Sequence, residues 1–124
     1  MNDALAGATP AKPAPAKRLC VYLGESDRSG HQPLYEAIVL KAREMHIAGA
    51  TVLRGPMGFG ANSRIHTAKI LRLSEDLPIV IEIVDAEPRI QAFLPTLESM
   101  AGSALITLER VRVIRYGQGG PASS

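Results

Sequence analysis

The residues whose types suit anion chemistry lie in one stretch, RGPMGFGANSRIH, at residues 54–66. It contains Gly55, Gly58 and Gly60, with Phe59 between the last two. Glycines let a backbone turn its N–H groups toward a bound anion, most simply a phosphate. They also occur where a strand bulges or where two backbones approach closely. Composition alone favours the bulged strand end and leaves a ligand loop open.

Two known phosphate loops do not fit this stretch. Gly55 and Gly60 have the separation of a Walker loop. However, Ala61 and Asn62 stand where the lysine and the metal-binding hydroxyl belong. The dinucleotide fingerprint lacks its third glycine, since Ser63 stands there. A phosphate site here would therefore have to be of another kind.

Basic side chains follow the glycines. Arg64, His66, Lys69 and Arg72 lie close together in the sequence. A connection of this length and charge is unusual for a β-hairpin, and long loops are often functional. Cations beside exposed backbone amides favour a phosphate ligand, whereas a solvated hairpin is the other interpretation.

Patterns typical of catalysis or metal binding are absent from the sequence. No two of the three histidines have the spacing of metal ligands. Glu75 and Asp76 are adjacent, so their side chains would point apart and make a poor acid–base pair. The single cysteine, Cys20, lies in the apolar run RLCVYLG and is expected to be a buried strand thiol. We therefore expect no enzyme activity and no metal.

The run ERVRVIR near the end of the chain is a second basic cluster. Arg110 and Arg112 share one face of a strand, and Arg115 faces the other side if the alternation holds. Charges of this kind keep an exposed edge strand soluble. They would also serve as a second set of phosphate donors.

Composition predicts one small soluble domain. The chain has 124 residues and a formal charge of +2, which by itself does not imply nucleic acid. No apolar run approaches the roughly 20 residues that span a bilayer, and the first residues have no secretory signal. We expect a cytoplasmic protein with disordered tails at residues 1–17 and 117–124 and one domain at 18–116.

Hydrophobic periodicity predicts the order strand, helix, strand, strand, helix, strand. The strands are expected at residues 18–24, 50–60, 77–85 and 103–117, and the helices at 33–49 and 86–102. Pro95 should kink the second helix, and a phase change near Glu109 and Arg110 predicts a bulge in the last strand.

This order predicts an α+β, ferredoxin-like (βαββαβ) sandwich, a four-stranded antiparallel sheet with two helices on one face. The run Val80, Ile81, Ile83, Val84 is too apolar for a strand with one face in water. We therefore expect a second subunit to cover the other face of the sheet.

Several motifs in combination resemble the uncharacterised bacterial PII-like family known as domain of unknown function 190. They are GATV at residues 49–52, GFG at 58–60, Ser63 with His66-Thr67, and Leu77-Pro78 with Val84-Asp85. The resemblance covers about residues 18–116. It implies a trimer whose sheets face inward.

The chain is also more distantly similar to the PII nitrogen-regulatory signalling proteins. These bind adenine nucleotides between subunits and contact partners through a loop after the second strand. Residues 61–73 match the position of that loop but are fewer and lack its tyrosine. Gly102 alone represents the glycine-rich phosphate loop, and Val113 replaces one of the two arginines of the last strand.

The resemblance implies a sensor that binds an adenine nucleotide or a similar phosphate-bearing ligand and regulates a partner, such as a membrane transporter. The alternative is a trimeric adaptor that docks on a transporter without any ligand. The expected nucleotide-binding residues are Gly58, Phe59, Gly60, Arg64, His66 and Arg115.

Overall fold

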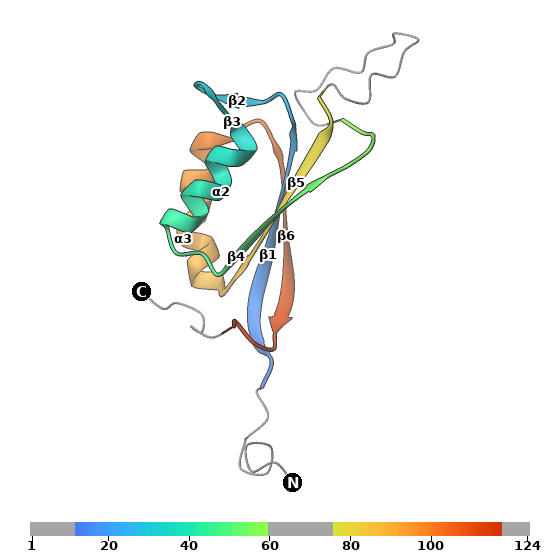
Figure 1. The fold of residues 1–124 in the computed structure, drawn as a ribbon. Helices are drawn as coiled ribbons and strands as arrows, with labels where there is room; N and C mark the ends of the chain where they lie inside the picture. Colours follow the sequence, from blue (N-terminus) through green and yellow to red (C-terminus); the bar gives the residue numbers. More distant parts are fainter. Residues whose placement is uncertain (1–11, 60–75, 118–124) are drawn as a thin grey trace.

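The structure, a computed structural model, describes residues 12–59 and 76–117. One α+β domain is formed in the order β1, β2, β3, α2, β4, β5, α3, β6 (Figure 1). The elements are β1 Ala14–Gly24, β2 Arg28–Ser29, β3 Gln32–Pro33, α2 Leu34–Glu44, β4 Gly49–Arg54, β5 Pro78–Asp85, α3 Glu87–Met100 and β6 Leu105–Val113.

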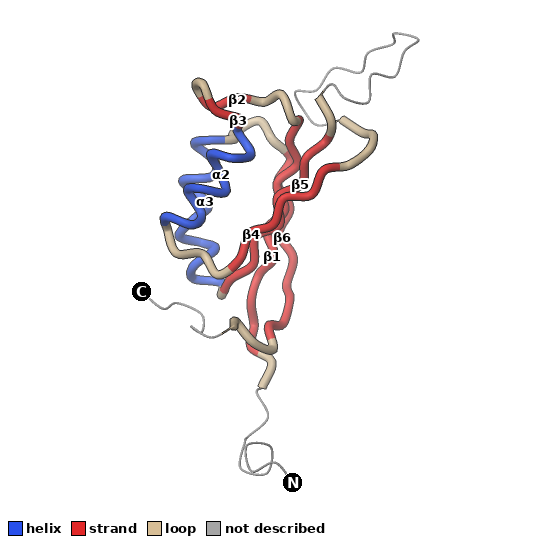
Figure 2. Tube along the Cα trace, viewed as in Figure 1, coloured by secondary structure: helices blue, strands red, loops and turns tan. Residues whose placement is uncertain are grey.

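The main sheet is antiparallel and has the strand order β4-β5-β1-β6. Helices α2 and α3 both cover the same face of this sheet (Figure 2). The short pair β2 and β3 is an additional hairpin before α2. The predicted ferredoxin-like fold is therefore confirmed.

The core lies between the helices and the two central strands. Every second residue of β5 is buried, beginning with Ile79. In β1, Leu19, Val21 and Leu23 are buried on the same side, and Cys20 between them is buried as well. The fully buried side chains of the core are Leu19, Val21, Ile38, Ile79, Ile81, Ile83, Ile90, Phe93 and Leu97. The core is almost entirely aliphatic because the chain has no tryptophan and only two phenylalanines.

Helix α3 begins and ends close to its predicted limits, and α2 begins where predicted but ends at Glu44, earlier than the predicted limit at residue 49. Proline stands just before or within the first turn of each, where its missing N–H costs no intrahelical bond. Helix α3 runs through Pro95 without a break in the assigned helix. Helix α2 ends before His46, whose φ of 62° lies in the left-handed region.

His46 is therefore a position at which glycine should be more stable. A side chain with a β-carbon is strained in the left-handed conformation, and glycine is not. We expect His46→Gly to raise the free energy of unfolding by about 0.5–1 kcal/mol, after allowing for the greater freedom of the unfolded chain. Urea denaturation checks this. His46→Ala is the control, and an alanine variant at least as stable as the glycine variant would contradict the argument.

Three predicted boundaries are wrong. Strand β1 begins at Ala14, so residues 14–17 belong to the sheet and not to a tail. Strand β4 ends at Arg54, because the glycines that follow leave the regular strand conformation. Strand β6 ends at Val113, and its pairing with β1 runs in one unbroken register from Leu105 to Val113, so the predicted bulge is absent.

The sheet face away from the helices is open and is arranged in rows across all four strands. The pairing registers align Leu53, Val80, Tyr22 and Leu105 in an apolar row. The next rows are Thr51, Glu82, Cys20, Thr107 and then Gly49, Val84, Arg18, Glu109. Of the apolar run in β5, only Val80 and Val84 face this side, since Ile81 and Ile83 belong to the core. The open face is thus less apolar than the sequence suggested.

Candidate functional site

The described glycines after β4 lie against the beginning of β5. The N–H of Gly55 donates to the carbonyl of Pro78 over 2.8 Å. Gly58 has a φ of 145°, and a β-carbon there would lie 3.2 Å from Cγ of Pro78. Both a strained backbone and close approach therefore require glycine at residue 58. The adjacent Phe59 is 66% exposed, so its ring is available to a ligand or a second subunit.

Half of the predicted ligand residues lie outside the described part of the chain. These are Gly60, Arg64 and His66. Their role as phosphate ligands stays a prediction. Gly58, Phe59 and Arg115 are described and can be placed.

Arg115 lines a cleft of about 480 Å³ at the other end of the sheet. Arg112 lines it too, and Ala48, Gly49 and Val84 contribute its other side. Neither guanidinium makes an ion pair with any described residue. Two unneutralised cations on a small cleft suit an anionic ligand.

Arg115 lies beyond the strand, not on its opposite face. Strand β6 ends at Val113, so the segment after it carries Arg115. Arg110 and Arg112 do share one face, as predicted, because the register with β1 is continuous. The sequence predicted Arg112 and Arg115 on opposite faces of one strand. The turn after β6 instead brings both to one cleft.

The two described parts of the predicted site lie at opposite ends of one protomer (Figure 1). The glycines contact Pro78, the first residue of β5, whereas the arginine cleft contacts Val84 near its end. Eight residues of strand at about 3.3 Å per residue separate the ends by roughly 23 Å. A single nucleotide cannot bridge Phe59 and Arg115 within one protomer.

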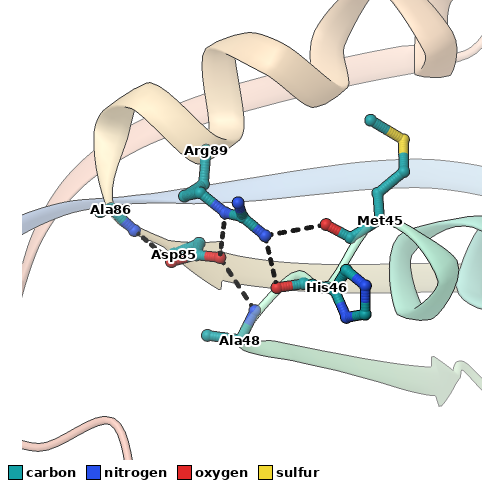
Figure 3. A network of polar contacts seen from close by, with 6 residues as sticks. All are labelled: Met45, His46, Ala48, Asp85, Ala86 and Arg89. Carbon is teal, nitrogen blue, oxygen red and sulfur yellow. Dashed lines mark hydrogen bonds and ion pairs between the residues drawn. The ribbon is translucent and has the colours of Figure 1, made fainter. Parts of the chain in front are cut away.

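A buried carboxylate, Asp85, fixes the backbone beside the arginine cleft (Figure 3). Its Oδ2 accepts the N–H of Ala48 over 2.9 Å, and its Oδ1 accepts the N–H of Ala86 over 2.7 Å. Arg89 lies 3.8 Å from Oδ2 and donates to the carbonyls of Met45 and His46. One side chain thus joins the end of β5 to the turn before β4 and to the start of α3.

This network was missed at the level of sequence. In the sequence, Asp85 was assigned to the end of the predicted strand at residues 77–85 and to the motif Val84-Asp85. The signal that could have found it is an acidic residue directly after a buried apolar strand, placed four residues before an arginine.

Cys20 is a buried strand thiol, as predicted. It is 6% exposed in the middle row of the open face. Burial raises the pKa of the thiol, and the neighbouring Glu82 adds to the rise. A thiol with a raised pKa forms less of the reactive thiolate at neutral pH, so the surroundings of Cys20 favour the neutral thiol.

Residues 12–59 and 76–117 contain neither a candidate metal cluster nor a candidate membrane-spanning helix. No group of three or more potential metal ligands occurs among them. None of their helices is long and apolar enough to cross a membrane.

The fold is that of PII-like proteins. A putative PII-like signalling protein from Thermus thermophilus superposes with a TM-score of 0.58 at 16% identity, covering 82% of this chain and 92% of that one. The PII-like protein CPII from Thiomonas intermedia, bound to ADP and bicarbonate, superposes with a TM-score of 0.50 at 21% identity, covering 85% and 94%.

The chain belongs to the DUF190 family, described as an uncharacterized ACR, whose model matches residues 16–113. A UPF0166 protein from Aquifex aeolicus is 36% identical over 98 residues, which are 79% of this chain and 92% of that protein. A UPF0166 protein from Methanocaldococcus jannaschii is 36% identical over 101 residues, covering 81% and 93%. The family predicted from the sequence motifs is confirmed.

Proposed function

We propose that the protein is a PII-like sensor that binds an adenine nucleotide between subunits of a trimer. The glycine end of one protomer, with Phe59, Arg64 and His66, forms one wall. The arginine cleft of the next protomer, with Arg115, forms the other. The protein acts in the cytoplasm, performs no catalysis, and reports the ligand to a partner through the loop at residues 61–73.

The observation that carries this proposal is the distance between the glycine end, with Phe59, and the arginine cleft, with Arg115. Phe59 and Arg115 lie at opposite ends of β5 and cannot meet within one chain. In a ring closed by heterologous contacts, different surfaces of neighbouring subunits meet. The glycine end of one protomer would then lie beside the arginine cleft of the next. ADP in the CPII structure and the shared fold make an adenine nucleotide the first ligand to test.

The open sheet face supports an oligomer. Leu53 and Leu105 are 48% and 56% exposed, and they flank Val80 and Tyr22 in one apolar row. Burying such a row against neighbouring copies would remove apolar surface from water. We expect a trimer mass by light scattering at micromolar protein, and a monomer mass would contradict the intersubunit site.

Calorimetry against ATP, ADP, AMP and cyclic AMP tests the ligand. Heat of binding with at least one of them is expected from the folded protein. If none binds, the nucleotide proposal fails, and a ligand-independent adaptor is the function that accounts for the fold and the oligomer.

Arg64 provides a test in the part of the chain outside the described residues. If Arg64 holds a phosphate, Arg64→Ala should weaken nucleotide binding roughly tenfold to a hundredfold, the range for a charge-assisted hydrogen bond. The trimer should persist, since Arg64 is predicted from the sequence to lie in a solvated loop. Binding as tight as that of the parent would show that this residue is not a phosphate ligand.

A further inference from the structure

The segment after β6, residues 114–117, turns back toward the start of β4. The cleft between them is lined on one side by Ile114, Arg115 and Tyr116 and on the other by Ala48 and Gly49. Ile114 is 67% exposed, so its side chain contributes little to holding the segment in place. The ring of Tyr116 is therefore the main apolar anchor.

This anchor carries an unsatisfied polar group. The Tyr116 hydroxyl is buried and has no hydrogen-bond partner among residues 12–59 and 76–117. Burial raises the pKa of Tyr116, and the nearby Asp85 carboxylate raises it further. The Asp85 oxygens already accept from the N–H groups of Ala48 and Ala86. In the docked position the hydroxyl is shielded from solvent and has no partner among the described residues, which weakens that position.

The two arginines of the cleft lie on different parts of the chain. Arg112 belongs to β6, whose pairing with β1 fixes it, whereas Arg115 belongs to the segment that folds back. Both arginines line the cleft when the segment is docked, so an anion that needs both guanidinium groups would require the docked position. Such a ligand has a higher affinity for the docked state and therefore shifts the population toward it.

We propose that residues 114–117 form a strap that exchanges between this docked position and an undocked one, and that a phosphate group bound between Arg112 and Arg115 holds it docked. The identity of the ligand as a nucleotide rests on the proposed function. The exchange itself does not, because it follows from the unpartnered hydroxyl. Gly117, with a φ of 89°, is a suitable pivot.

Hydrogen exchange of the full-length protein tests the strap without any ligand. Tyr116→Phe keeps the ring and removes the unsatisfied hydroxyl, so the amides of residues 115–117 should exchange roughly five- to tenfold more slowly than in the parent. Tyr35→Phe, on α2, is the matched control and should leave these amides unchanged. Exchange in Tyr116→Phe at the parental rate or faster would overturn the strap.

Addition of ADP or inorganic pyrophosphate tests the anion step. Either should slow exchange at residues 115–117 in the parent, and in Arg112→Gln the rates measured with and without anion should be the same. If ADP binds by calorimetry but neither anion slows the strap, the anion step is overturned and the proposed function stands. If no nucleotide binds, the proposed function fails, while pyrophosphate and Tyr116→Phe still decide the strap.

Discussion

Asp85→Ala should be strongly destabilising, lowering the free energy of unfolding by roughly 2–4 kcal/mol. The carboxylate is fully buried and accepts the backbone N–H groups of Ala48 and Ala86. Alanine leaves both donors without a partner, at about 1–2 kcal/mol each. It also removes the acidic neighbour of Arg89, whose guanidinium holds the end of α2.

Urea denaturation at one fixed protein concentration measures this loss, because an oligomer's stability depends on concentration. Glu87→Ala is the matched control. That carboxylate is 57% exposed and pairs with Lys17 at 3.6 Å, so its removal should cost less than about 1 kcal/mol. Equal effects of the two substitutions would show that the Asp85 network contributes no more than a surface pair.

Mixing two inactive variants should restore nucleotide binding if the site is shared between subunits. Gly58→Val damages only the glycine end, because valine is strained at a φ of 145° and would press on Pro78. Arg115→Glu damages only the arginine cleft by reversing its charge. Each variant alone should lose at least a hundredfold in affinity, the upper part of the range expected for one charge-assisted contact.

Trimers formed after unfolding and refolding an equal mixture should recover about one quarter of the sites, since each half is native in half of the chains. Calorimetry gives this number directly as the stoichiometry. No recovery would place the site within one protomer and so contradict the intersubunit proposal. Arg43→Glu, an exposed charge reversal on α2, is the control and should bind as the parent does.

The open face and the ligand cleft together describe how such a sensor would work. The side-chain rows on the open sheet face would determine how neighbouring protomers pack. That packing would place the glycine end of one protomer beside the arginine cleft of the next and so complete the binding site. A strap anchored by Tyr116 then adds a step that depends on occupancy. Under this proposal, the ligand would bind at a site completed by assembly, and its presence would then change the position of residues 114–117.

Much of the fold was predictable because local rules and the tertiary structure agree. The stripe of Leu34, Ile38 and Ala42 predicts the buried face of α2, and all three side chains are buried. For β5 the sequence predicted burial on both faces, whereas only every second residue, beginning with Ile79, is fully buried. Prolines at the helix starts mark those ends correctly. The predicted start of β1 and the predicted end of β4 were wrong, since these strands begin at Ala14 and end at Arg54. Pairing with a neighbouring strand, and not composition, sets how far a strand extends.

The family, the order of the elements and the glycine and arginine clusters could all be recognised in the sequence. These depend on residue types and short spacings. Three findings required the tertiary structure. Phe59 and Arg115 lie at opposite ends of β5, and Arg112 lines the same cleft as Arg115. Asp85 links three elements. Contacts between distant segments follow from strand register and from the turn after β6, and no local pattern encodes either of them.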